Sequence, residues 1–168
     1  MKDLVAFLAH ARWFGGKGRP FRVTGTHRIG VVPGCPPDGV RAVVDLAVVE
    51  YDDAVGGVDL YQLPLSLYRE RQGWLDHAQV GHWEDDELGE VYAYDSLHDR
   101  EAMACWLRSF AAEESGPITF HRVPGHDLDL EAHSTLFSGE QSNSSVAFGE
   151  DSLLKVFRRV TPGVNPDI

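Results

Sequence analysis

A short polar loop followed by a lysine-bearing strand is the part of this sequence best equipped for chemistry. Residues 138–143 read Ser-Gly-Glu-Gln-Ser-Asn, and Lys155 lies in an apolar run further along the chain. Backbone N–H groups of such a loop can bind nucleotide phosphates, and a lysine on a following strand can reach the α and β phosphates. The loop has only one glycine, Gly139, rather than the usual kinase spacing, and lysines on amphipathic strands are commonly just solvated. The pattern alone therefore leaves open both a nucleotide site and ordinary surface.

Other chemistry-bearing motifs fail on context or spacing. The glycine-rich segment at residues 15–18 follows a predicted helix and precedes a strand, the reverse of a phosphate-binding loop. The histidine pairs His77/His82 and His121/His126 are each five residues apart, which does not match the i, i+4 spacing of helical metal ligands. No serine lies in a GxSxG motif. We expect no metal site and no hydrolase nucleophile.

Hydrophobic periodicity and turn residues indicate an α+β fold that is antiparallel throughout. The pattern predicts helices at 3–14 and 97–112, the second with Ser96 as N-cap and Asp99 as a capping-box acid, and strands at 21–32, 40–51, 58–67, 89–94, 118–123, 128–136, 144–148 and 153–157. Residues 69–87 are predicted to form a surface loop. Because proline cannot donate to a strand ladder, Pro64 is expected at an edge or a bulge.

Composition narrows the class of protein. The chain has 168 residues, with 15 Lys plus Arg against 26 Asp plus Glu, a net charge of 15 − 26 = −11. This acidity argues against a nucleic-acid partner. No apolar run is long enough to span a membrane, and the N-terminus lacks a signal peptide, so we expect a cytoplasmic protein with no membrane partner. Cys35 and Cys105 are far apart in sequence and are interpreted as reduced structural thiols.

The final residues have the signature of a helix start. Asn165 suits an N-cap, Pro166 suits the first helical position, and Asp167 complements the helix dipole. No helix follows in the sequence. We therefore expect the chain to be the first part of a longer protein.

Several segments together resemble the maltokinases of bacteria, specifically actinobacteria. The resemblance rests on SGEQSNSS at 138–145, LLKVFRR at 153–159, PGVNP at 162–166, RWFGGKGR at 12–19 and YQLPL at 61–65. These segments span nearly the whole chain. The first three are similar to the ATP loop and lysine strand of that family, and the last two to its N-terminal cap.

The resemblance implies a fold, a reaction and a set of binding residues. Residues 1–95 would be the N-terminal cap subdomain, and 96–168 part of an intermediate subdomain that resembles the N-lobe of a protein kinase. The parent enzyme would use ATP and Mg²⁺ to convert maltose to maltose 1-phosphate, in the pathway from trehalose to glycogen and related α-glucans. Lys155 would hold the α and β phosphates, and backbone amides around Gln141, Ser142, Asn143 and Ser144 would hold the β and γ phosphates.

The machinery of phosphoryl transfer is incomplete in this sequence. No HxDxxxxN pattern occurs, so the catalytic residues are expected beyond Ile168, and we expect this chain alone to be inactive. Maltose and, through the cap, trehalose synthase are the partners that the resemblance suggests. Two alternatives stay open: a non-catalytic cap or interaction module, and a fragment of a related glucosamine kinase.

Overall fold

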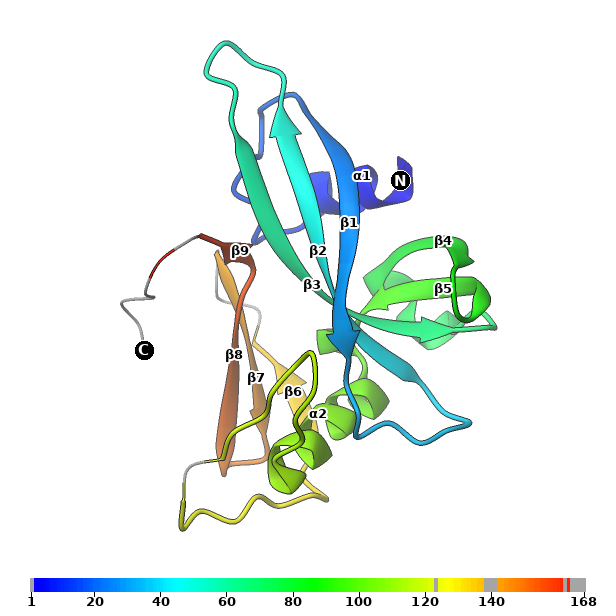
Figure 1. Cartoon of the computed structure of the whole chain (residues 1–168), viewed down its shortest axis with the longest axis vertical. Coiled ribbons are helices and arrows are strands. Elements are labelled where there is room, and N and C mark those ends of the chain that lie inside the picture. Colours follow the sequence, from blue (N-terminus) through cyan, green and yellow to red (C-terminus); the bar gives the residue numbers. More distant parts are fainter. Residues whose placement is uncertain (1, 123, 138–141, 162, 164–168) are drawn as a thin grey trace.

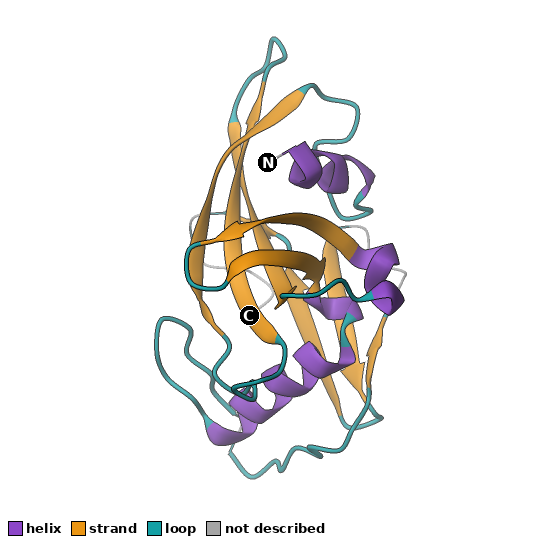
Figure 2. Cartoon of the chain, turned by 90° about the vertical axis from the view of Figure 1, so that its right-hand side faces the viewer, coloured by secondary structure: helices purple, strands orange, loops and turns teal. Residues whose placement is uncertain are grey.

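The computed structural model describes residues 2–122, 124–137, 142–161 and 163, and shows two antiparallel sheets with a few helices (Figures 1 and 2). This is the α+β class that the sequence predicts. No helix among the described residues is long and apolar enough to cross a membrane. In chain order the elements are α1 (Lys2–His10), β1 (Phe21–Val31), β2 (Arg41–Tyr51), β3 (Val58–Tyr68), η1 (Gly73–Ala78), β4 (Gln79–Asp85), β5 (Gly89–Asp95), η2 (Ser96–His98), α2 (Arg100–Ala112), β6 (Ser134–Leu136), β7 (Asn143–Phe148), β8 (Ser152–Phe157) and β9 (Arg159–Val160).

The larger sheet is a curled meander with the strand order β1-β2-β3-β5-β4, in which β9 also pairs with β3. Its long strands β1, β2 and β3 run side by side in Figure 1. Val-rich β2 is buried along most of its length, as expected for a strand with neighbours on both sides. The smaller sheet has the order β6-β7-β8. The strands β1–β2–β3 and β6–β7–β8 follow one another closely in the chain and pair antiparallel, and the distant β9 also joins β3 antiparallel.

Pro64 lies at a local edge within the larger sheet, so the predicted edge is confirmed, whereas the alternative of a bulge is wrong. It pairs with Val44 of β2 in an unbroken register. On the other side of β3, β9 pairs with Leu60 and Tyr61, whereas β5 begins its pairing at Leu65. Because N–H groups two residues apart point the same way, the missing donor of Pro64 faces the gap between these two partner strands.

The prediction of a surface loop over 69–87 is also wrong, because this segment contains η1 and β4. Strand β4 has the sequence QVGHWED, which has little intrinsic preference for extended structure. It is held by pairing with β5 and by the turn between them. In that turn the Asp85 carboxylate accepts the N–H groups of Glu87 and Leu88, and Gly89 supplies a positive φ of 75°.

Both helices are shorter than predicted. Helix α1 ends at His10 rather than residue 14, because Trp13 and Phe14 leave the helix to pack their rings against Tyr61, with centroids 5.9 and 5.1 Å away. Helix α2 begins at Arg100, and its N-cap is Asp99, whose carboxylate accepts two backbone N–H groups at 3.0 and 3.3 Å. Ser96 belongs to η2 instead and caps nothing.

Two predicted strands are absent or shortened. Residues 118–122 form no strand, and of the predicted strand at 128–136 only β6 is extended. Asp129 accounts for the difference, because its side chain accepts the N–H of Glu131 and its carbonyl accepts that of Ala132. These local bonds close a turn that competes with a strand ladder. The predicted C-terminal helix start at 165–166 lies outside the described residues.

Two hydrophobic cores share β2. Its residues Val43, Ala47 and Val49 face the core formed by α1 and the larger sheet. The alternate residues Ala42 and Val44 face a second core, which contains α2 and inward-facing side chains of β7 and β8. Strand alternation thus places side chains of β2 in both cores, and β2 connects the packing of the larger sheet to that of the smaller sheet.

A buried ion pair joins the two sheets. Arg158 lies between β8 and β9 and is 1% exposed. Its Nη2 donates to Asp95 Oδ2 at 2.7 Å and its Nε to Ser144 Oγ at 2.9 Å, while its guanidinium lies 4.6 Å from the ring centroid of Trp13. The residue therefore connects the end of β5, the beginning of β7 and the segment after α1. A buried cation of this kind requires its carboxylate partner.

We predict that Asp95→Ala lowers the free energy of unfolding by about 3–5 kcal/mol, because it leaves the Arg158 cation buried without a counter-ion. Urea titration followed by tryptophan fluorescence measures the loss. The double variant Asp95→Ala/Arg158→Met should lose less than the sum of the two single variants.

The control is Asp76→Ala, which removes the exposed ion pair between Arg71 and Asp76 and should leave stability unchanged. A loss below about 1 kcal/mol in Asp95→Ala would show that the pair does not hold the sheets together.

Candidate functional site

The smaller sheet is a three-stranded meander that pairs β7, the strand after the predicted loop, with β8, the strand that carries the lysine. The loop connects β6 to β7, and a tight turn at residues 149–151 connects β7 to β8, with Gly149 at a φ of 56°. Lys155 lies in the middle of β8, directly opposite Ser145 of β7. This order of strand, loop, strand, turn and lysine strand is the order that the sequence predicts.

The register of the sheet sorts the site residues between its two faces. Residues paired across an antiparallel ladder share a face, and successive residues alternate. Asn143, Ser145 and Ala147 therefore share one face with Phe157, Lys155 and Leu153. We call this the lysine face. Ser144, Val146, Leu154 and Val156 occupy the other face, where the second core lies.

The five predicted binding residues are thus only partly brought together. Asn143 and Lys155 lie on the lysine face. The side chain of Ser144 points away from it, is buried and accepts the hydrogen bond from Arg158, so only its backbone is available to a ligand at Lys155. Ser142 is exposed and directly precedes β7, and Gln141 lies outside the described residues.

The lysine face carries apolar side chains that sequence reasoning missed. Leu153 is 61% exposed, and it is paired with Ala147 at the position next to the Ser145–Lys155 pair. Phe157 lies on the other side, with its ring centroid 5.1 Å from Lys155 Nζ. Neither Leu153 nor Phe157 belongs to either hydrophobic core. The sequence does hold a signal for Leu153. It lies two residues before Lys155, and alternation along a strand places both side chains on one face.

This arrangement suits an anionic ligand with a flat apolar part. An ammonium group is a point charge that binds phosphate oxygens, and exposed aliphatic side chains can cover one face of a planar ring. Both occur side by side on the lysine face. Among the residues that the structure describes, no three His, Cys, Asp or Glu side chains gather as a metal site.

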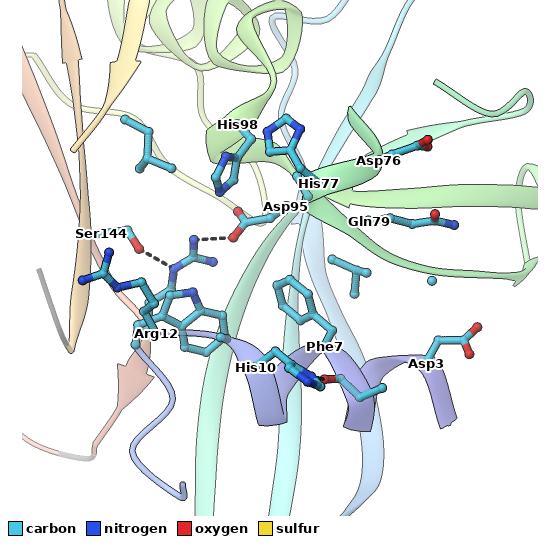
Figure 3. Close-up of a pocket in the computed structure, with 18 of the residues that line it drawn as sticks. Asp3, Phe7, His10, Arg12, Asp76, His77, Gln79, Asp95, His98 and Ser144 are labelled. Carbon is cyan, nitrogen blue, oxygen red and sulfur yellow. Dashed lines mark hydrogen bonds and ion pairs between the residues drawn. The ribbon is translucent and has the colours of Figure 1, made fainter. Parts of the chain in front are cut away.

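A cleft of about 910 Å³ lies between α1, the η1–β4 segment and the start of the smaller sheet (Figure 3). Ser144, Asp95 and Arg158 line it, together with Arg12 and the histidines His10, His77 and His98. Partial desolvation by the neighbouring residues lowers the pKa of His98 and so favours its neutral form. Asn143 and Ser144 both line the cleft, whereas Lys155 does not.

Comparison with known protein families adds an identification for the larger sheet. The maltokinase N-terminal cap domain matches residues 7–99, which is more than half of the chain. The match begins within α1 and ends after η2, and it therefore contains the whole meander from β1 to β5. The smaller sheet and its lysine lie beyond it. The chain belongs to the maltokinase N-terminal cap domain family.

Proposed function

We propose that this chain is the N-terminal part of a maltokinase, in which it supplies the cap and the ATP-binding strands. The parent enzyme would transfer the γ-phosphoryl group of ATP to the anomeric hydroxyl of maltose. Two observations support the proposal: the family match at residues 7–99, and the register that places Lys155 beside exposed Leu153 and opposite β7, the strand that follows the polar loop. The second observation carries the nucleotide-binding part.

Each group on the lysine face has a role in this proposal. The Lys155 ammonium group contacts the α and β phosphates, and backbone N–H groups around residues 141–144 contact the β and γ phosphates. Leu153 and Ala147 cover one face of the adenine ring. The side chain of Ser144 holds Arg158 instead and contributes no contact to the nucleotide. The loop is thereby attached to the cap through the strand that follows it.

The described residues hold no group of three His, Cys, Asp or Glu side chains that could bind a metal, and the sequence contains no HxDxxxxN pattern. We therefore assign the Mg²⁺ ligands, the catalytic base and the maltose site to protein outside this chain, and we expect the isolated chain to bind nucleotide weakly and to release no ADP. Nucleotide binding and phosphoryl transfer thus require separate measurements.

The reaction is tested with the full product of the open reading frame that encodes this chain. ADP release is measured with maltose, with glucosamine and without a sugar. Turnover that requires maltose supports the proposal. Turnover with glucosamine but not maltose would assign a related sugar kinase, and no turnover with either sugar would favour a non-catalytic cap module.

We predict that Lys155→Ala in the full enzyme lowers kcat/KM for ATP by roughly 10²-fold, because it removes the cation beside the phosphates. Steady-state kinetics with varied ATP measure the loss. The control is Lys17→Ala, which removes an exposed lysine of the cap whose Nζ only donates to the Arg12 carbonyl. Wild-type kinetics in Lys155→Ala would refute the assignment.

We further predict that Leu153→Asp raises KM for ATP roughly tenfold, since it removes the apolar cover and adds a negative charge near the phosphates. Leu153 is 61% exposed, so thermal unfolding should be unchanged. Val55→Asp is the matched control, because Val55 is 86% exposed in the turn between β2 and β3. Equal KM values in the two variants would rule out adenine contact at Leu153.

A further inference from the structure

The two cysteines, which are distant in sequence, meet in the fold. Cys35 lies in the β1–β2 connection and is partly exposed, whereas Cys105 lies in α2 and is buried. The two thiols are near enough for each to shift the pKa of the other. The sequence interpretation of two separate structural thiols missed this contact, which no local spacing reveals.

The backbone around Cys35 is held tightly against α2. The N–H of Gly34 donates to Ser109 Oγ at 2.9 Å, and the Gly34 carbonyl accepts a hydrogen bond from Arg108 Nε at 2.8 Å. A Cβ at position 34 would lie 2.3 Å from the carbonyl oxygen of Cys105, so only glycine permits this approach. The residue before Cys35 is therefore in contact with the backbone of Cys105, and the two thiols are kept within reach of each other.

Positive groups and hydrogen-bond donors surround the sulfur atoms. Arg108 Nη2 donates to Cys105 Sγ at 3.4 Å, and the N–H of Ala42 donates to Cys35 Sγ at 3.4 Å. These groups favour a thiolate over a thiol. The pKa of Cys35 is lowered, first by the neighbouring Cys105 side chain, with the N–H of Ala42 and the charges of Arg108 and Arg41 acting in the same direction.

The two thiols differ in their chemistry. The neighbouring Cys35 raises the pKa of Cys105, and burial raises it further. The S–H of Cys105 donates to the Glu101 carbonyl at 3.3 Å. Cys35 is thus the more exposed and more acidic member of the pair, and Cys105 keeps its proton. This division matches a reactive thiol beside a resolving thiol.

We propose that Cys35 and Cys105 form an oxidation site for hydroperoxides, at which an intrachain disulfide joins the β1–β2 connection to α2. The Cys35 thiolate attacks one peroxide oxygen and breaks the O–O bond, giving a sulfenic acid and, after protonation, water or an alcohol. Cys105 then attacks the sulfenic sulfur, loses its proton and releases water. A thiol reductant reverses the reaction by exchange.

The disulfide would tie the β1–β2 connection to α2 within the second core. Cys105 belongs to this core, and Cys35 is partly buried against it. In Figure 1 the β1–β2 connection and α2 lie at the same end of the molecule. Cross-linking restricts the unfolded chain between residues 35 and 105, so the oxidised protein should unfold at a higher temperature.

The test treats the reduced chain with hydrogen peroxide, denatures it, labels free thiols with an alkylating reagent and measures the intact mass. We expect the treated protein to carry no label and to remain monomeric, and to regain two labels after reduction with dithiothreitol. Counting labels is unaffected by methionine oxidation. Two labels retained after peroxide treatment, or interchain dimers in place of monomer, would overturn the proposal.

Single variants separate the two roles. In Cys105→Ser, Cys35 should stop at the sulfenic acid, which a cyclic 1,3-diketone probe captures. In Cys35→Ser, Cys105 should keep its label throughout. Arg108→Gln should slow disulfide formation about tenfold by removing the cation beside the sulfur atoms. Arg100→Gln, at the exposed start of α2, is the matched control. Equal oxidation of the two thiols in their respective single variants would contradict the assigned roles.

Discussion

The position of Lys155 relative to the cap depends on how one arginine is accommodated. Strands β8 and β9 are one nearly continuous chain segment that leaves the smaller sheet and enters the larger one, and Arg158 is the residue at the crossing. Its carbonyl accepts the N–H of Gln62 at 2.7 Å, and its side chain satisfies Asp95 and Ser144. A charge at this depth is tolerated only with all of these partners, so the crossing is fixed in one geometry.

The same crossing explains why a single strand of the smaller sheet serves two purposes. Ser144 and Ser145 are neighbours in β7, yet alternation turns them to opposite faces. Ser144 is used to hold the arginine, and Ser145 lies across from Lys155. Strand β7 therefore contacts the cap through Ser144 and contributes the next residue, Ser145, to the lysine face. The family match covers only the cap, but the physical unit that positions the lysine includes both sheets.

The parts of the fold that sequence reasoning predicts are those where local pattern and tertiary structure agree. Its valine-rich composition predicts β2, and the alternation of apolar and polar residues predicts β8. Strand β4 does not, because pairing with β5 and the Asp85 turn override its weak propensity. The N-cap residue of helix α2 was predicted wrongly for a related reason. Ser96 and Asp99 both suit an N-cap, and only the intervening η2 turn decides between them.

The candidate site was likewise predicted only in part from the sequence. The loop and Lys155 were found from residue type and order. The opposite orientation of Ser144 and the exposure of Leu153 require the register, which depends on the length of the turn at residues 149–151. The contact between Cys35 and Cys105 requires the packing of a loop on a helix and has no local signal at all.

Pro64 has a consequence for how far the two sheets can merge. Ladder pairing between β9 and β3 covers only Leu60 and Tyr61, followed by the bond from Gln62 to Arg158. The next backbone donor of β3 that would point toward the β8–β9 segment is the N–H of residue 64, which proline lacks. The ladder therefore stops, and β8 diverges into its own sheet. One imino acid limits the ladder between β9 and β3 to a few residues, so the two sheets do not form one continuous barrel wall.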